Sequence, residues 1–245
     1  MKYTRVSSAA RVAWARFIDQ VRIAEDELKP QGEVWYRGVT ESGHKLTPSL
    51  LRYSNGLNLE PELFAVFQMV ARADIGLSAG NNWARLFSMQ HHAVPTRLLD
   101  WTTALAVAVY FAIRPSGSGD PAVYVLNPET VNLSALSSVK VDLLGRNGPK
   151  DYDPTGGPSL PLPFACLAPY DTERIRAQSG RFTVHGKKID PVEKAHPSST
   201  RQIRISQTAI PAAREFLRYA GINDYTIYPD VEGLAPYLKS MTGLR

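Results

Sequence analysis

The residues best suited to chemistry lie close together between Gln90 and Ile113, a stretch that reads QHHAVPTRLLDWTTALAVAVYFAI. Its first half carries the polar side chains of Gln90, His91, His92, Thr96, Arg97, Asp100, Thr102 and Thr103. From Ala104 to Ile113 the only polar group on a side chain is the Tyr110 hydroxyl. A helix that is apolar on every face must be buried all round. We therefore predict a buried helix over residues 103–113 that begins at the polar run, where unpaired backbone N–H groups attract phosphate or a nucleotide.

Arg37 is a second candidate for binding an anion. It ends a predicted strand over residues 33–37 that contains Trp35 and Tyr36, and Gly38 follows it. A guanidinium offers a rigid fork of donors that matches a phosphate or a carboxylate. The sequence leaves two interpretations equally open: Arg37 binds a ligand, or it forms a structural ion pair, for example with Asp100.

Structural roles are also open for the other polar residues. Asp100 or Thr102 could cap the apolar helix, and Arg97 could pair with Asp100 three residues further on. Neither role excludes a ligand, because a buried Arg–Asp pair is often retained to orient something. Gln178, in the segment ERIRAQSGRFTV, could contact a base or ribose edge, or it could tie down a loop.

Several weaker motifs argue against other kinds of site. His91 and His92 are adjacent, so on a helix they point about 100° apart and rarely share one metal ion. We expect no metal site. The segment GVTESGHK resembles a P-loop, but Leu46 stands where a magnesium-binding Ser or Thr belongs, so we reject that interpretation. Cys166 is the single cysteine and lies in an apolar context, which favours an inert core position.

Composition bounds the class of protein. A chain of 245 residues with 44% apolar residues is long enough for one large globular domain with a substantial core. The net charge of +5 permits nucleotide or nucleic-acid partners without demonstrating them. With one cysteine and no apolar run long enough to cross a bilayer, we expect a cytoplasmic location and no membrane partner.

Hydrophobic periodicity predicts the elements that position these residues. Helices are expected over residues 8–28, 59–75, 82–91, 171–178, 211–219 and 231–238, and strands over residues 122–126, 164–167, 181–185, 202–205 and 225–228. In the second helix, apolar residues at helical spacing predict the face toward the core: Leu59, Leu63, Val66, Phe67 and Val70.

The predicted elements favour an α+β fold, because helices and strands do not alternate regularly. We expect a mixed or antiparallel sheet core and a largely helical N-terminal half around one buried central helix. Residues 1–245 are expected to form a single domain, with an N-terminal helix within residues 1–30. Residues 137–163 are rich in Gly, Pro and Asp and are expected to form a loop-rich insertion.

Together these motifs resemble the FRG domain, a bacterial and phage-associated family named for an aromatic-Arg-Gly motif. Tyr36-Arg37-Gly38 resembles that motif, and residues 90–102 match the hallmark Q-H-x-x-x-P-T-R-L-L-D-W-T. Further similar segments are Tyr110-Phe111-Ala112, Arg174 to Phe182 and the tail GINDYTIYPDVEGLA. His92 and Ala93 replace an aromatic-Gly pair that is usual in the hallmark. The resemblance spans nearly the whole chain.

A weaker resemblance is to arginine-specific ADP-ribosyltransferases. Arg37-Gly38 is similar to their aromatic-Arg-Gly on a first strand, and residues 100–103 resemble their Ser/Thr-rich turn on a middle strand. The arginine-specific enzymes also carry a Gln/Glu-x-Glu near a later strand, and the segment AQSGRFTV is similar to the A-Q-x-E-F region of DNA-targeting ADP-ribosyltransferase toxins. The glutamate is absent, and Gly180 and Arg181 stand at the nearest positions.

These resemblances imply an ADP-ribosyltransferase-like sheet and a toxin or anti-phage defence effector that uses NAD as its substrate. The implied catalytic residues are Arg37, His91, Asp100 and Gln178. The implied NAD-binding residues are Arg37, Gly38, Gln90, His91, Thr96, Arg97 and Thr102. Asp100 or Glu173 would supply the missing carboxylate. The implied partners are a nucleotide ligand, a nucleic-acid or protein acceptor, and an antitoxin or phage trigger.

Two alternatives belong to other functional classes. In a ribonuclease-like toxin, His91 or His92 would be the general acid or base, and Arg37 and Arg97 would clamp phosphate. A non-catalytic module would bind a nucleotide, a nucleic acid or a phage component without turnover, which fits the missing glutamate best.

Overall fold

The structure is a computed structural model that describes residues 5–71, 82–114, 119–142, 155, 158, 160–168 and 172–242. Within these residues the strands form a six-stranded sheet in the order β4-β5-β2-β1-β3-β6, and every neighbouring pair is antiparallel. The strands are β1 (Trp35–Val39), β2 (Leu98–Thr102), β3 (Ala122–Leu126), β4 (Phe164–Cys166), β5 (Gly180–Val184) and β6 (Thr200–Arg204). The fold class is therefore α+β with an antiparallel sheet, as the sequence predicts.

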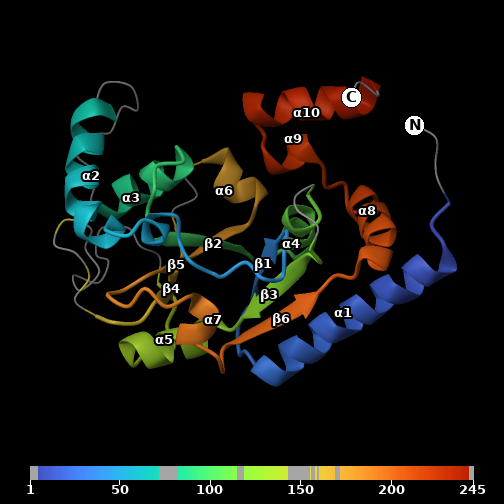
Figure 1. Ribbon diagram of the computed structural model, residues 1–245, viewed down its shortest axis with the longest axis horizontal. Helices are drawn as coiled ribbons and strands as arrows, with labels where there is room; N and C mark the ends of the chain where they lie inside the picture. Colours follow the sequence, from blue (N-terminus) through green and yellow to red (C-terminus); the bar gives the residue numbers. More distant parts are fainter. Residues whose placement is uncertain are drawn as a thin grey trace.

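Helices cover both faces of this sheet (Figure 1). The α-helices of the described residues are α1 (Ser8–Leu28), α2 (Gly56–Ala71), α3 (Asn82–His91), α4 (Leu105–Ala112), α5 (Pro128–Leu136), α6 (Glu173–Ala177), α7 (Val192–Ala195), α8 (Ile210–Tyr219), α9 (Asp224–Ile227) and α10 (Val231–Thr242). Among them, none combines the length and the apolar character needed to cross a bilayer.

Side-chain alternation along the central strands separates two cores. Tyr36 and Val123 point to one face, where they pack in one cluster with residues of α1, α4 and α8. Trp35 and Tyr124 point to the other face, in a cluster that includes Val131 of α5 together with a residue of α7. The predicted buried helix is confirmed as α4, which packs across β1 on the first of these faces.

The sheet is split between β1 and β2. In the described residues these strands pair at Tyr36 and Thr102 alone, whereas every other pair of neighbouring strands is in register over three to five residues. Beyond that one pair the strands diverge, so the sheet consists of the halves β4-β5-β2 and β1-β3-β6. The divergence leaves space between two strands that carry Arg37 and Asp100.

The strand predicted over residues 225–228 is wrong. Residues Asp224–Ile227 form the helix α9, and the Asn223 side chain accepts hydrogen bonds from the backbone N–H groups of Tyr225 and Thr226. The Thr226 hydroxyl accepts a hydrogen bond from the Asn223 backbone N–H, which completes a capping box. This local capping outweighs the preference of Tyr225 and Tyr228 for strands.

The polar run also lies in a different element from the one predicted. Residues 98–102 are the strand β2 rather than the start of a helix, and α4 begins later, at Leu105. The face predicted for the second helix is correct only in part, because Leu63 and Phe67 pack against the core whereas Leu59, Val66 and Val70 are exposed. Its buried face instead presents residues such as Glu60, whose carboxylate meets Arg97.

Other expectations fall partly outside the described residues. The predicted helix 59–75 extends beyond residue 71, and the predicted helix 171–178 begins at residue 171, before the described segment. Most of the predicted insertion 137–163 is likewise outside, and its described positions contain no helix or strand. The organisation into a single domain stays a prediction. Besides α9, the helices α5 and α7 were not predicted.

Candidate functional site

A cavity of about 920 Å³ lies where β1 and β2 diverge. Its walls come from β1 and the loop after it, the end of β2, the end of α3, one side of α4, and the segment from α6 into β5. Its volume is near the upper end of the range of roughly 300–1,000 Å³ that is usual for small-molecule sites. The cavity is therefore large enough for a ligand with several chemical groups.

The charges that line this cavity are unbalanced. Among the described lining residues, the cationic side chains are Arg37, Lys45, Arg52, Arg114 and Arg174. The one carboxylate among them belongs to Asp100. Low-dielectric walls strengthen the field of such a cluster. The cavity is therefore suited to a ligand with more than one negative charge.

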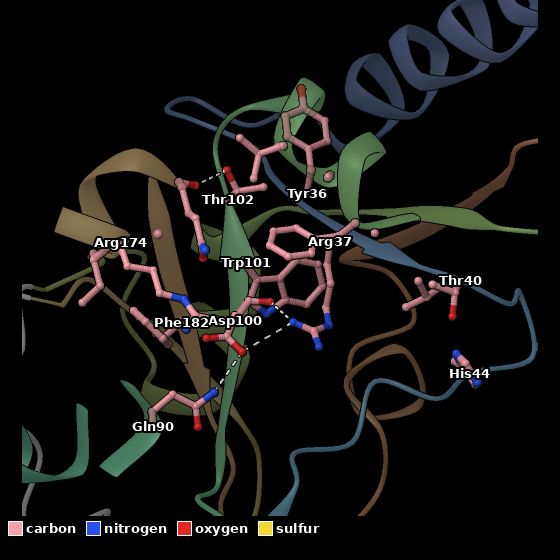
Figure 2. Close-up of a pocket in the computed structure, with 18 of the residues that line it drawn as sticks. Tyr36, Arg37, Thr40, His44, Gln90, Asp100, Trp101, Thr102, Arg174 and Phe182 are labelled. Atoms are coloured by element: carbon pink, nitrogen blue, oxygen red, sulfur yellow. Dashed lines mark hydrogen bonds and ion pairs between the residues drawn. The ribbon is translucent and has the colours of Figure 1, made fainter. Parts of the chain in front are cut away.

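Arg37 and Asp100 meet inside the cavity (Figure 2). Arg37 Nη1 donates a hydrogen bond to the Asp100 backbone oxygen and lies 3.8 Å from the carboxylate atom Oδ2. The Arg37 side chain is 23% exposed and that of Asp100 is 52% exposed. The structural ion pair between Arg37 and Asp100 is therefore present, and both side chains line the cavity at the same time.

Gln90 fixes the orientation of the Asp100 carboxylate. Its Nε2 donates to Asp100 Oδ2 at 2.9 Å, and its Oε1 accepts a hydrogen bond from the Thr96 hydroxyl. Because the amide oxygen is engaged by a hydroxyl donor, the NH₂ group must face the carboxylate. Thr96 itself is buried and lies outside the cavity lining, so its contact with the cavity runs through Gln90.

Arg52 faces the same part of the cavity as Arg37. Its Nε and Nη2 both donate to the backbone oxygen of Thr47, at 3.2 Å and 3.1 Å. Burial lowers the pKa of Arg37, the Asp100 carboxylate raises it, and repulsion from Arg52 lowers it further. Arginine stays charged regardless. The positive charges of Arg37 and Arg52 therefore repel each other, and an anion bound in the cavity would reduce that repulsion.

Gly38 is explained by packing. A Cβ atom at this position would lie 1.9 Å from the backbone oxygen of Ala108 and 2.7 Å from the backbone nitrogen of Ala112, both in α4. Only a residue without a side chain lets α4 lie this close to β1. Gly38 lines the cavity, yet its identity is set by the helix behind it rather than by a ligand.

Thr102 and Gln178 line the cavity with their polar atoms engaged in hydrogen bonds. The Thr102 hydroxyl donates to the Gln178 backbone oxygen at 2.7 Å and accepts from the Ala104 N–H at 3.0 Å. Gln178 Nε2 donates to the backbone oxygen of Ile227 at 3.1 Å. Of the two expected caps, Thr102 therefore bonds near the start of α4 and Asp100 does not. Gln178 connects its loop to α9.

Arg97 does not pair with Asp100, which corrects the sequence-based expectation. Its side chain is fully buried, Nε donates to Glu60 Oε1 at 2.9 Å, and Nη1 donates to the His185 backbone oxygen at 3.3 Å. The side chain crosses toward α2 and lies outside the cavity lining. Its observed role is to join α2 to the sheet, so it is not placed to clamp phosphate or bind NAD.

Only one of the two adjacent histidines belongs to the cavity lining. His91 lines the cavity and His92 does not, and their rings meet edge to face with centroids 4.9 Å apart. Glu173 is exposed and outside the lining, so of the two carboxylates considered Asp100 is the one in the cavity. The described residues contain no group of three or more His, Cys, Asp or Glu side chains that would bind a metal ion.

Four cations of the cavity were not assigned to a site from the sequence: Lys45, Arg52, Arg114 and Arg174. Arg174 begins one of the segments that resemble the FRG domain, and this was the available signal. Nothing local in the sequence places the four cations in one cavity, because residues 45–52, Arg114 and Arg174 lie far apart along the chain.

Comparison with known families matches residues 32–120 to the FRG domain. The chain contains an FRG domain. The matched span includes Tyr36-Arg37-Gly38, the hallmark at residues 90–102 and the helix α4. The FRG domain therefore supplies both strands that diverge at the cavity, whereas Arg174 and Gln178 come from later segments. Comparisons with curated proteins and with solved structures gave no significant match.

Proposed function

We propose that the cavity of this FRG domain binds a nucleotide and that phosphate groups lie between Arg37 and Arg52. The observation that carries the proposal is that Arg37 and Arg52 both line this cavity, with Asp100 as the carboxylate beside Arg37. Phosphate oxygens would replace their repulsion with charge-assisted hydrogen bonds. The apolar walls formed by Phe87 and Phe182 suit the flat ring of a base or a nicotinamide.

The nucleotide that we propose is NAD, and the reaction is ADP-ribosyl transfer on an ADP-ribosyltransferase-like sheet. Three segments support this proposal, since Arg37, Asp100 to Thr102, and Gln178 resemble motifs of that enzyme class. They lie on or beside β1, β2 and β5, which are neighbours in the sheet, and all three line the cavity. The order of the segments along the chain thus corresponds to adjacent positions in space.

In this reaction the bond between ribose C1′ and the nicotinamide nitrogen breaks, and neutral nicotinamide leaves with the bonding electrons. A positive charge develops on the ribose, and the Asp100 carboxylate would stabilise it. A nucleophilic atom of the acceptor then forms a bond to C1′ and releases its proton, for which Asp100 is a candidate base. Arg37 would keep the phosphates in place during both steps.

A binding experiment tests the nucleotide site. We expect calorimetry to show NAD binding by the wild-type protein and at least about tenfold weaker binding by Arg37→Gln, because a charged hydrogen bond is lost. The matched control is Arg204→Gln, since Arg204 is exposed on β6 and outside the cavity lining. Wild-type protein that binds neither NAD nor an adenine nucleotide would refute the proposed function.

Asp100→Asn separates binding from chemistry. The substitution preserves shape and removes the negative charge, so NAD should bind equally or more tightly. Nicotinamide release, followed by chromatography, should fall about 100-fold or more. If the chain is a toxin or defence effector, induced expression of the wild type should arrest growth and expression of Asp100→Asn should not. Full turnover by Asp100→Asn would contradict this assignment.

One observation favours a second candidate function, a binding module without turnover. The Asp100 carboxylate accepts a hydrogen bond from Gln90 and lies beside Arg37, so its charge is already partly compensated. NAD that binds the wild-type protein and releases no nicotinamide would select this candidate over the transferase.

A further inference from the structure

Two further arginines of the cavity, Arg114 and Arg174, contact one aromatic ring, that of Tyr228. The guanidinium carbon of Arg174 lies 4.6 Å from the centroid of the Tyr228 ring, and that of Arg114 lies 5.8 Å from the same centroid. Arg114 Nη1 also donates to the Tyr228 hydroxyl at 3.1 Å. Both arginines line the cavity. Figure 2 shows Arg174 extending toward Phe182 and Asp100.

Arg114 is the member of this cluster that is exposed to solvent. A guanidinium that stacks on an aromatic ring is fixed in orientation, and its N–H groups lie in its own plane, where they can still donate. Arg114 is exposed, and no ion pair with a carboxylate involves it within the described residues. The cluster is therefore a preorganised site for negatively charged oxygens at an open edge of the cavity.

We propose that Arg114, Arg174 and Tyr228 form a second phosphate-binding subsite, which binds the backbone of a nucleic-acid single strand. Cations next to an aromatic ring are the combination that binds phosphates and stacks bases along a strand. Phe111, whose ring meets Tyr228 edge to face with centroids 6.3 Å apart, extends the aromatic surface into the cavity. That the strand is the acceptor of ADP-ribose rests on the proposed function.

The C-terminal helices position this subsite. Tyr228 directly follows α9, and Gln178 of the α6 segment donates to the backbone oxygen of Ile227. Asp224, at the start of α9, accepts a hydrogen bond from the Tyr110 hydroxyl of α4. The segments that bear Arg114 and Arg174 are therefore joined through α9. Tyr228 is a positioning residue that orients both guanidinium groups.

Fluorescence anisotropy with a labelled 12-nucleotide single strand tests the proposal. We expect Arg114→Gln and Arg174→Gln each to weaken binding about fivefold and to reduce the slope of log K against log salt by about 0.7, the value of one phosphate contact on a single strand. Tyr228→Leu should weaken binding more than Tyr228→Phe, which keeps the ring. The matched control is Arg218→Gln, because Arg218 stacks on Tyr219 at 4.2 Å outside the cavity lining.

Three outcomes would overturn the subsite: binding that Arg114→Gln and Arg174→Gln leave unchanged, complete competition by free thymidine monophosphate at concentrations equal to those of strand phosphate, or equally tight binding of poly-glutamate. The second would indicate a free nucleotide and the third an acidic protein. Titration of the wild-type protein with NAD tests the proposed function independently of the subsite. If the protein binds the strand at this cluster and does not bind NAD, the proposed function is refuted and the subsite is supported.

Discussion

At the scale of single residues, the FRG hallmark divides into two sets of roles. Gln90 and Asp100 point into the cavity, whereas Thr96 orients the Gln90 amide and Arg97 pairs with Glu60 in the interior. Thr96 and Arg97 are neighbours of these residues in sequence and lie outside the cavity lining. A run of polar residues is therefore not by itself a list of ligand contacts.

Ala93 allows a direct test of one departure from the hallmark. It ends α3 with a φ of 58°, and its N–H bonds to the Gln90 oxygen while that of Val94 bonds to the Met89 oxygen, a Schellman motif. Glycine adopts this φ without strain. Ala93→Gly should therefore raise the free energy of unfolding by about 1 kcal/mol in urea titrations. A lower stability would show that the loop tolerates Ala93 without strain.

At the scale of elements, the split between β1 and β2 and the contact of α4 with β1 create the cavity. The helix lies against the strand at Gly38, and its Val107 and Phe111 form an apolar wall. Because β1 pairs with β2 at Tyr36 alone, Arg37 can reach across to the Asp100 backbone oxygen. The position of one helix therefore determines whether the site exists.

Gly38→Ala tests this dependence. Its methyl group would lie 1.9 Å from the Ala108 oxygen, so α4 must shift or the fold must loosen. We expect a loss of at least about 3 kcal/mol in thermal or urea unfolding, the upper end of overpacking costs. Gly43→Ala is the control, because its Cβ would meet nothing within 4 Å. Equal stability of the two variants would contradict the packing explanation.

At the scale of the whole molecule, buried groups that join distant elements make stability depend on pH. His185 directly follows β5, and its side chain is fully buried. Burial lowers its pKa to about 3, to which the positive charge of Arg97 also contributes. Burial also lowers the pKa of His196, which bonds to Ser134.

The lowered pKa of His185 makes the free energy of unfolding decrease as the pH falls. The unfolded chain takes up a proton on His185 below its ordinary pKa of 6.5, and the folded chain does not until about pH 3. The stabilisation is therefore complete above pH 6.5 and is lost as pH falls toward 3. Between pH 7 and pH 5 we expect a loss of about 2 kcal/mol from this group. His185→Gln should reduce the pH dependence in urea titrations at both values, and an unchanged dependence would refute the assignment.

The sequence by itself determined the elements that depend on neighbouring residues. The helices α1, α3 and α8 and the strand β3 follow from spacing, caps and β-branched runs, which are local properties. The same local information identified Arg37, Asp100 and the FRG motifs. Residues 225–228 differ from the prediction, because the aromatic residues favour a strand whereas the capping box at Asn223 starts the helix α9.

Only the tertiary structure decided which charges meet. Arg52, Arg114 and Arg174 join Arg37 because the sheet splits and α9 links separate segments, and such contacts depend on the packing of the whole chain. Arg97 is buried for the same kind of reason, since its partner Glu60 is 37 residues away on α2. Hydrophobic periodicity reports on residues that are near one another in the sequence and not on contacts at that separation. The residue types therefore indicated which side chains could bind an anion, and the structure was needed to show which of them line one cavity.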